Sequence, residues 1–249
     1  MNYKFLIQYD GSRYSGWQKQ GNTQKTIQGK MEAVLGKMTG TQVEVHGSGR
    51  TDAGVHAYGQ TANAHFQTDL SVNQIRDYLN QYLPEDIAVL EVTTVHPRFH
   101  SRLNASKKTY CYRIRTNPLR DVFGRKYTYS MEGPFDVHAM RRAAALLTGT
   151  HDFTSFCANR RMKKSAVRTI YEIRIEQTED ELEFWFTGDG FLQYMVRILT
   201  GTLVETGLGK READSMTAVL EAKNRDAAGM TMPPQGLALM NVFYMKEPV

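Results

Sequence analysis

The sequence predicts an α+β protein made of two split-βαβ halves whose strands form one continuous, mainly antiparallel sheet flanked by helices. Segments with alternating apolar residues, typical of half-buried strands, are interspersed with segments whose apolar residues recur every three or four positions, typical of amphipathic helices. In the first hundred residues the order of these segments is strand, helix, strand, strand, helix, strand. The second part repeats this order with insertions, which is the pattern of ferredoxin-like and RRM-like domains.

The first half begins with a strand in which Tyr3, Phe5, Ile7 and Tyr9 alternate up to an Asp-Gly turn. Ser71 is placed to cap the second helix. The apolar run at 87–95 indicates a more fully buried strand. The expected elements are strands at 3–9, 43–45, 62–66 and 87–95 and helices at 27–38 and 72–83.

The second half contains a helix capped by Asp136, two cleanly alternating strands, and a strongly apolar helix at 191–203. The expected strands lie at 107–116, 125–130, 167–175, 182–186 and 237–245, and the expected helices at 137–147, 191–203 and 213–220. We place the boundary near residues 100–106, which divides the chain into 1–103 and 104–249. Because no low-complexity linker separates the halves, we expect them to pack tightly and leave a cleft between them.

Composition limits the possible classes of function. The 249 residues carry a formal net charge of +5, which suits an anionic partner such as nucleic acid. No apolar run is long enough to span a membrane, and the N-terminus lacks a signal-peptide pattern. With only two cysteines, Cys111 and Cys157, neither a disulfide framework nor a cysteine-ligated zinc site is expected. These features indicate a cytoplasmic protein.

Basic residues form two clusters, and Tyr110 and Tyr112 interleave with the first. Alternating basic and aromatic side chains are able to hold phosphates and stack bases. On composition alone, a solvated strand face and a solvated loop explain both clusters slightly better. The clusters comprise Lys107, Lys108, Arg113, Arg115 and Arg120, and then Arg160, Arg161, Lys163 and Lys164.

The most informative segment is the glycine-rich stretch 47–60, GSGRTDAGVHAYGQ. It is no dinucleotide fingerprint, because Asp52 occupies the place of the third glycine and would repel a pyrophosphate. A phosphate-binding P-loop is also absent, since Arg211 follows Lys210 where Ser or Thr is required. His96 and His100 have the spacing of a helical zinc site, but the proline between them argues against a helix.

What remains in this stretch is the carboxylate of Asp52, two residues after Arg50. A nearby guanidinium keeps a carboxylate ionised and oriented, and an ionised Asp is able to act as a nucleophile. The alternative is an Asp that caps a turn with Arg50 as its surface partner. For an Asp in a generic glycine-rich loop that alternative is the more common one.

The stretch 47–60 closely resembles the catalytic motif of the bacterial tRNA pseudouridine synthase A family. The resemblance extends over nearly the whole chain, because further segments match in order. They are YDGSRYSGWQ (9–18), KKTYCYRI (107–114), GTHDFTSFC (149–157), RTI (168–170), GDGFLQYMVRILTGTLVETG (188–207) and PPQGLALMNVFY (233–244). One departure is Met232, where relatives usually carry Ala before the proline, and it bears only on a packing detail.

The resemblance implies an isomerase that converts uridine to pseudouridine in the anticodon stem-loop of tRNA, at positions 38–40. It implies a homodimer in which one tRNA contacts both subunits, a basic cleft between the two halves, and no metal or other cofactor. Asp52 matches the catalytic aspartate, and Arg197, on the flank of the helical apolar stripe, its ionic partner. Tyr110 matches an active-site tyrosine, and Leu237 a leucine that packs on the target base.

Arg50 is placed to enter the space vacated by a flipped nucleotide or to hold its phosphate. Without the resemblance, Tyr110 is better explained as a core aromatic of an alternating strand and Leu237 as an ordinary strand residue. A second hypothesis is a non-catalytic tRNA-binding or tRNA-folding module, which the basic clusters and tyrosines alone would support. Intact Asp52, Tyr110 and Arg197 argue against it.

Overall fold

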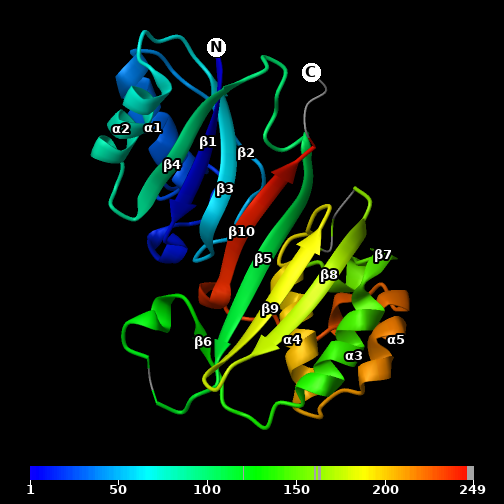
Figure 1. Cartoon of the computed structure of the whole chain (residues 1–249). Coiled ribbons are helices and arrows are strands. Elements are labelled where there is room, and N and C mark those ends of the chain that lie inside the picture. Colours follow the sequence, from blue (N-terminus) through cyan, green and yellow to red (C-terminus); the bar gives the residue numbers. More distant parts are fainter. Residues whose placement is uncertain (120, 160, 162–163, 246–249) are drawn as a thin grey trace. The chain divides into compact units, whose positions relative to one another are not determined.

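The computed structural model of this chain describes residues 1–119, 121–159, 161 and 164–245. They form ten strands and five α-helices in a mixed, mostly antiparallel α+β arrangement (Figure 1), which confirms the expected fold class. The chain divides into two compact units. Unit 1 comprises Met1–Ser106 and Ala238–Val249, and unit 2 comprises Lys107–Leu237.

The strands of unit 1 have the order β4-β1-β3-β10, and β2 also pairs with β3. β1 is antiparallel to both β3 and β4, whereas β10 runs parallel to β3. The bounds are β1 Asn2–Tyr9, β2 Val45–Gly47, β3 His56–His65, β4 Ile87–Val95 and β10 Leu237–Tyr244. Because β1 is antiparallel to both of its neighbours, β3 and β4 begin at the same end of the unit.

Helices α1 (Ile27–Thr39) and α2 (Val72–Tyr82) cover the unit 1 strands. α2 begins at the predicted cap, where the Ser71 hydroxyl accepts from the Gln74 N–H and the Gln74 side chain accepts from the Ser71 N–H. The apolar faces of the helices and strands meet in one core. Its fully buried members include Phe5, Ile7, Leu35, Ile75 and Leu79.

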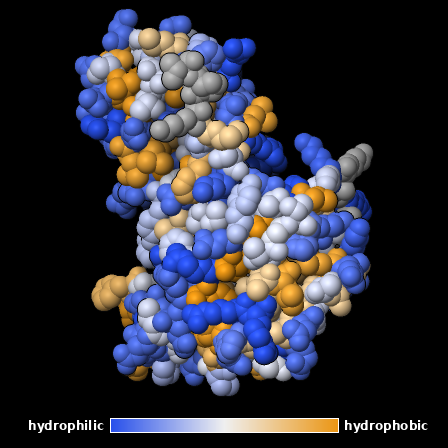
Figure 2. Space-filling view, turned by 45° about the vertical axis from the view of Figure 1, so that its right-hand side comes forward, coloured by the Kyte–Doolittle hydropathy of each residue, from blue (hydrophilic) through white to orange (hydrophobic). Residues whose placement is uncertain are grey.

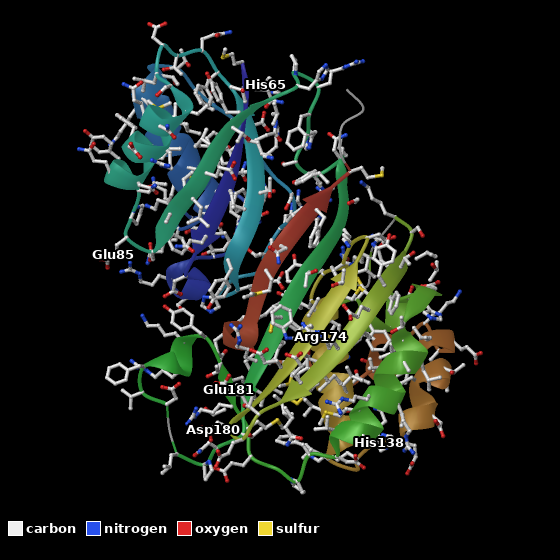
Figure 3. All side chains as sticks on the ribbon, viewed as in Figure 1. His65, Glu85, His138, Arg174, Asp180 and Glu181 are labelled. Carbon is white, nitrogen blue, oxygen red and sulfur yellow. The ribbon has the colours of Figure 1, made fainter. Side chains whose placement is uncertain are left out.

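Unit 2 has the strand order β5-β9-β8-β7, with β6 parallel to β5. The pairs β5–β9, β9–β8 and β8–β7 are all antiparallel. The bounds are β5 Ala105–Arg115, β6 Tyr129–Ser130, β7 Gly149–Asp152, β8 Val167–Gln177 and β9 Glu181–Gly188. Figure 3 labels Asp180 and Glu181 at the tight β8–β9 connection.

The helices of unit 2 are α3 (Val137–Leu147), α4 (Met195–Gly207) and α5 (Met216–Glu221). Asp136 caps α3 as predicted, because its carboxylate accepts from the Ala139 N–H at 2.9 Å. α3 packs against α4, α5 and β8. Almost every residue of α4 is buried, so this helix runs through the interior of unit 2.

Several sequence expectations need correction. β3 begins at His56, inside the glycine-rich stretch 47–60 and well before the strand expected at 62–66, and β2 begins only at Val45. The strand at 87–95 is not fully buried, since β4 lies at the edge of the sheet and exposes 43% of Leu90. The segment 125–130 is a 3₁₀ turn followed by the two-residue β6, and β7 was not expected at all.

The helix expected at 191–203 begins only at Met195. Tyr194 adopts a left-handed conformation with φ 61°, which no helical residue has. Phe191 therefore lies in the turn before the helix. Its apolar character continues the helical periodicity because this turn also packs into the core.

The functional division of the chain into 1–103 and 104–249, and the basic cleft between the halves, stay predictions. Of the predicted basic clusters, Arg120, Arg160 and Lys163 lie outside the described residues. Among the helices of the described part of the chain, none is long and apolar enough to cross a membrane. The face drawn in Figure 2 is largely hydrophilic, with hydrophobic residues in scattered patches.

Candidate active site

Asp52 lies in the loop that connects β2 to β3 and is half-buried, whereas Arg50 in the same loop is exposed. Backbone hydrogen bonds fix the loop on both sides of Asp52. The Trp17 N–H donates to the Thr51 carbonyl at 3.1 Å, and the Val55 N–H donates to the Asp52 carbonyl at 3.1 Å. The carboxylate is therefore presented from a backbone whose conformation is held by its neighbours.

The N-terminal segment 9–18 supports this loop at close range. Gly16 has φ 97°, and a Cβ there would lie 2.6 Å from the Thr51 carbonyl oxygen. A Cβ on Gly11 would lie 2.0 Å from the Val55 carbonyl oxygen. Two backbones this close require glycine at both positions. Segment 9–18, which resembles the family's N-terminal segment, therefore packs directly against the backbone of the Asp52 loop.

Buried polar side chains also hold the Asp52 loop in place. The hydroxyl groups of Tyr9 and Thr51 are 2.8 Å apart. The Gln60 amide donates to the Gly49 carbonyl at 3.0 Å and accepts from the Ser48 hydroxyl at 2.6 Å. Burial raises the pKa of Tyr9 to about 12, so its hydroxyl stays protonated at neutral pH.

The middle of segment 9–18 is tied to the residue just before β4. The Tyr14 hydroxyl donates to Asp86 at 2.5 Å, and the Arg13 guanidinium forms an ion pair with the same carboxylate. In Figure 3, Glu85, the neighbour of Asp86, and His65, the last residue of β3, mark opposite ends of unit 1. The Asp52 loop precedes β3 and so lies at the Glu85 end.

Arg197 lies in the first turn of α4 in unit 2 and is half-buried. Its Nε donates to the Met232 carbonyl at 2.6 Å, and the Met232 N–H donates to the Arg197 carbonyl at 3.2 Å. The guanidinium carbon lies 4.7 Å from the centre of the Tyr194 ring, within the range of a cation–π interaction. These contacts hold the guanidinium in one orientation.

The departure at Met232 has a simple structural reading. Arg197 contacts the backbone of Met232, and the Met232 side chain is fully buried. The Tyr112 hydroxyl donates to the carbonyl of the next residue, Pro233, at 2.8 Å. Arg197 therefore keeps its support whichever apolar side chain stands at position 232.

Tyr110 and Leu237 are both largely buried in unit 2, with 7% and 5% of their surfaces exposed. Tyr110 lies in β5 and meets the Phe191 ring edge-on, with the ring centres 5.2 Å apart. Leu237 is the first residue of β10 and follows the turn Pro234–Gly236. The segment 232–237 therefore connects Met232, whose backbone contacts Arg197, to Leu237.

The structure therefore places Arg50 and Asp52 on one loop of unit 1 and Tyr110 and Arg197 on β5 and α4 of unit 2, whereas Leu237 is the last residue of unit 2, at the start of β10. Sequence reasoning assigned no role to Tyr9 or Gly16, which hold the Asp52 loop. The only sequence signal for them was the family-like segment 9–18, because neither residue type is diagnostic by itself. No group of three His, Cys, Asp or Glu side chains in the described part of the chain is arranged to hold a metal ion.

The sequence profile described as tRNA pseudouridine synthase matches residues 6–104 and 143–245, more than half of the chain. The chain is 48% identical over 228 residues to tRNA pseudouridine synthase A of Bacillus sp. (strain KSM-64), covering 92% of this chain and 93% of that protein. It is 48% identical to the protein of the same name from Geobacillus sp. (strain WCH70), covering 97% of each chain.

A third relative, tRNA pseudouridine synthase A 2 of Bacillus anthracis, is 43% identical over 241 residues, covering 97% of this chain and 98% of that protein. The profile match includes both the Asp52 loop and the N-terminal turn of α4. The chain therefore belongs to the tRNA pseudouridine synthase family of isomerases.

Proposed function

We propose that the chain converts uridine to pseudouridine in the anticodon stem-loop of tRNA, at positions 38–40, with Asp52 as its nucleophile. The observation that carries this proposal is the family's GRTDAG sequence on a loop whose backbone is fixed from two sides. A half-buried carboxylate on such a loop is pre-organised for attack, because little conformational freedom is lost when substrate binds.

The reaction breaks the N1–C1′ bond, rotates the uracil, and joins C5 to C1′, with the C5 proton released to water and N1 taking up a proton from water. No atoms are gained or lost overall, so this chemistry needs no metal and no redox cofactor. Asp52 attacks C6 of the base or C1′ of the ribose, or assists elimination at the ribose. All three routes require an ionised carboxylate and a site that keeps the detached base from escaping.

Arg197 is proposed as the partner that keeps Asp52 ionised and aimed. Its place in the fold supports this role. A cation in the first turn of a helix opposes the helix dipole, which costs about 0.3–1 kcal/mol. Tyr194, the N-cap residue of α4 whose ring contacts Arg197, has a left-handed conformation that is unfavourable for a residue with a side chain. Locally unfavourable features of this kind are typical of functional sites.

The target uridine must leave its stack before reaction, which costs a few kcal/mol. We assign three residues to this step. Arg50, exposed on the Asp52 loop, enters the vacated space or holds the flipped nucleotide's phosphate. Tyr110 stacks on the uracil, and its hydroxyl is able to exchange a proton. Leu237 packs against the base.

We further infer a homodimer in the cytoplasm, in which one tRNA contacts both subunits and each subunit has a basic cleft between its two halves. The support is the resemblance to the bacterial family over nearly the whole chain. Sedimentation of the purified chain with and without tRNA tests this inference, and a monomer that is active at all concentrations would contradict it.

The central test is release of tritium from tRNA labelled at uridine C5. Asp52→Asn should lower release by more than about a thousand-fold, because the amide keeps the shape of the carboxylate but not its charge. Binding of tRNA should persist. Asp69→Asn is the matched control, since Asp69 is exposed and lies outside the Asp52 loop, and it should retain wild-type release.

Mapping of the pseudouridines in the product then tests the proposed positions. Wild-type turnover by Asp52→Asn would overturn the nucleophile assignment. If the wild-type chain binds tRNA but releases no tritium, the chain is instead a tRNA-binding or tRNA-folding module.

A further inference from the structure

Unit 2 contains a cavity of about 330 Å³ that none of the proposed catalytic residues lines. It lies where the end of β7, the start of β8 and the loop after α5 come together. All of its walls belong to unit 2. The polar side chains that matter for what it could bind are Asp152, Asn159, Lys164, Lys223, Asn224 and Arg225.

The ionisable side chains of this cavity are mostly basic. Lys164, Lys223 and Arg225 face one carboxylate, Asp152. Lys223 Nζ lies 3.1 Å from Asp152 Oδ2, so this carboxylate offsets one of the three positive charges. The Asp152 carboxylate also accepts from the hydroxyl and the N–H of Thr154, which lower its pKa and keep it ionised. The lining therefore carries a net charge of about +2 at neutral pH.

Arg225 is half-buried, and neighbouring polar groups hold its guanidinium. Its Nη2 donates to the Thr231 hydroxyl at 2.8 Å, and its Nη1 donates to the Ala228 carbonyl at 3.4 Å. A braced guanidinium loses less side-chain entropy when it binds an anion. By contrast, Lys164 and Lys223 are exposed and sit at the rim, where they are able to reach a ligand from solvent.

Two asparagines add neutral donors to the same lining. The Asn159 side-chain oxygen accepts from the Arg161 N–H at 3.0 Å, and that of Asn224 accepts from the Asp226 N–H at 3.1 Å. Since both oxygens point to backbone N–H groups, both NH₂ groups are the parts left to face a ligand. Amide and guanidinium donors together are typical of groups that contact phosphate oxygens.

We propose that this cavity is a phosphate-binding site, separate from the Asp52 loop, that holds a backbone phosphate of the RNA substrate. Three cations against one carboxylate select an anion, and the amide donors suit the several oxygens of a phosphate. The choice of RNA as the source rests on the proposed function. A free phosphate has the same chemistry, and the experiment below separates the two sources.

The test uses the full chain with Lys164→Gln, Lys223→Asn and the double variant. Asn is chosen at 223 because Lys223 has φ 45°, a left-handed conformation that Asn tolerates. Lys210→Gln is the matched control, because Lys210 is an exposed lysine of unit 2 outside the cavity. Circular dichroism and thermal melting confirm that each variant is folded. The Kd for unmodified tRNA is measured between about 50 and 200 mM salt.

Each single variant should raise the Kd about five-fold at low salt, and the slope of log Kd against log salt should fall by about one. Lys210→Gln should leave both unchanged. The second arm is ³¹P line broadening of inorganic phosphate, which the wild-type chain should cause and the double variant should not. Loss of broadening without a change in tRNA affinity would assign the site to free phosphate.

If neither tRNA affinity nor phosphate broadening changes in the double variant, the cavity is no phosphate site. Repeating the binding measurement in an Asp52→Asn background separates this proposal from the catalytic one. The cavity variants should weaken binding there by the same factor, whatever the effect of Asp52→Asn on tritium release.

Discussion

The hydroxyl groups of Tyr9 and Thr51 meet at 2.8 Å in the interior of unit 1, one residue before Asp52. Tyr9 is the last residue of β1, whereas Thr51 belongs to the loop between β2 and β3. The contact therefore joins the central strand of the unit to the loop that carries the proposed nucleophile. The position of the Asp52 carboxylate therefore depends on contacts such as this one between the loop and β1.

Tyr9→Phe should destabilise the chain by about 1 kcal/mol at neutral pH, because the Thr51 hydroxyl loses its partner in the interior. The variant should also weaken tritium release, since the residue before Asp52 is less firmly held. Urea unfolding and the tritium assay measure the two effects. Unchanged values of both would show that the Tyr9–Thr51 contact does not position the loop.

The same substitution predicts a pH effect. Burial raises the pKa of Tyr9 from 10.0 to about 12, so the folded chain holds this proton more tightly than the unfolded chain. The resulting stability is complete below a pH of about 10 and is lost as the pH rises from there through about 12. The wild-type chain should therefore lose more stability over this range than Tyr9→Phe, which lacks the ionisable group.

Gly16→Ala should abolish activity and lower stability by about 2–4 kcal/mol, because the new Cβ would lie 2.6 Å from the Thr51 carbonyl oxygen at a positive φ. Gly40→Ala separates strain from the close contact. Gly40 also has a positive φ, 69°, but nothing lies near its missing Cβ. Gly40→Ala should lower stability by only about 1 kcal/mol and leave tritium release intact. An equal effect of both substitutions would contradict the interpretation that the close contact of Gly16 with Thr51 supports the Asp52 loop.

Arg197→Lys should lower tritium release by about ten- to a hundred-fold at saturating tRNA. A lysine keeps the charge but cannot donate to the Met232 carbonyl and face a carboxylate with the same planar group. Arg142→Lys, on the exposed face of α3, is the control and should behave as wild type. Wild-type release by Arg197→Lys would show that charge alone suffices at this position.

Met232→Ala should lower stability by about 2–5 kcal/mol, because its side chain is fully buried and its removal leaves a cavity. The folded variant should still release tritium, since Arg197 contacts only the backbone at this position. Met230→Ala, whose side chain is 43% exposed, should cost less than about 1 kcal/mol. Loss of release in folded Met232→Ala would mean that the side chain itself shapes the site.

Local patterns predicted many elements of the fold well. The alternation in β9 and the caps at Ser71 and Asp136 depend on neighbouring residues only, so the sequence displays them directly. The start of β3 was missed because it depends on a contact between segments that are distant in the chain. Gly59 suggests a loop, but in the structure its missing Cβ leaves room for the Met240 carbonyl, 2.3 Å from where a Cβ would lie. A close approach between strands so distant in the chain leaves no local signal.

The sequence by itself determined the family, the α+β class and the candidate residues. A long ordered series of motifs can be recognised along the chain without knowing which residues are in contact. Only the tertiary structure decided what holds Asp52 and Arg197. The Asp52 loop is contacted by Tyr9, Gly16 and Trp17, which come from a distant part of the chain. Arg197 is held by Met232, which follows it in the chain only after α5. Such contacts follow from the packing of distant segments, which no periodicity or spacing encodes.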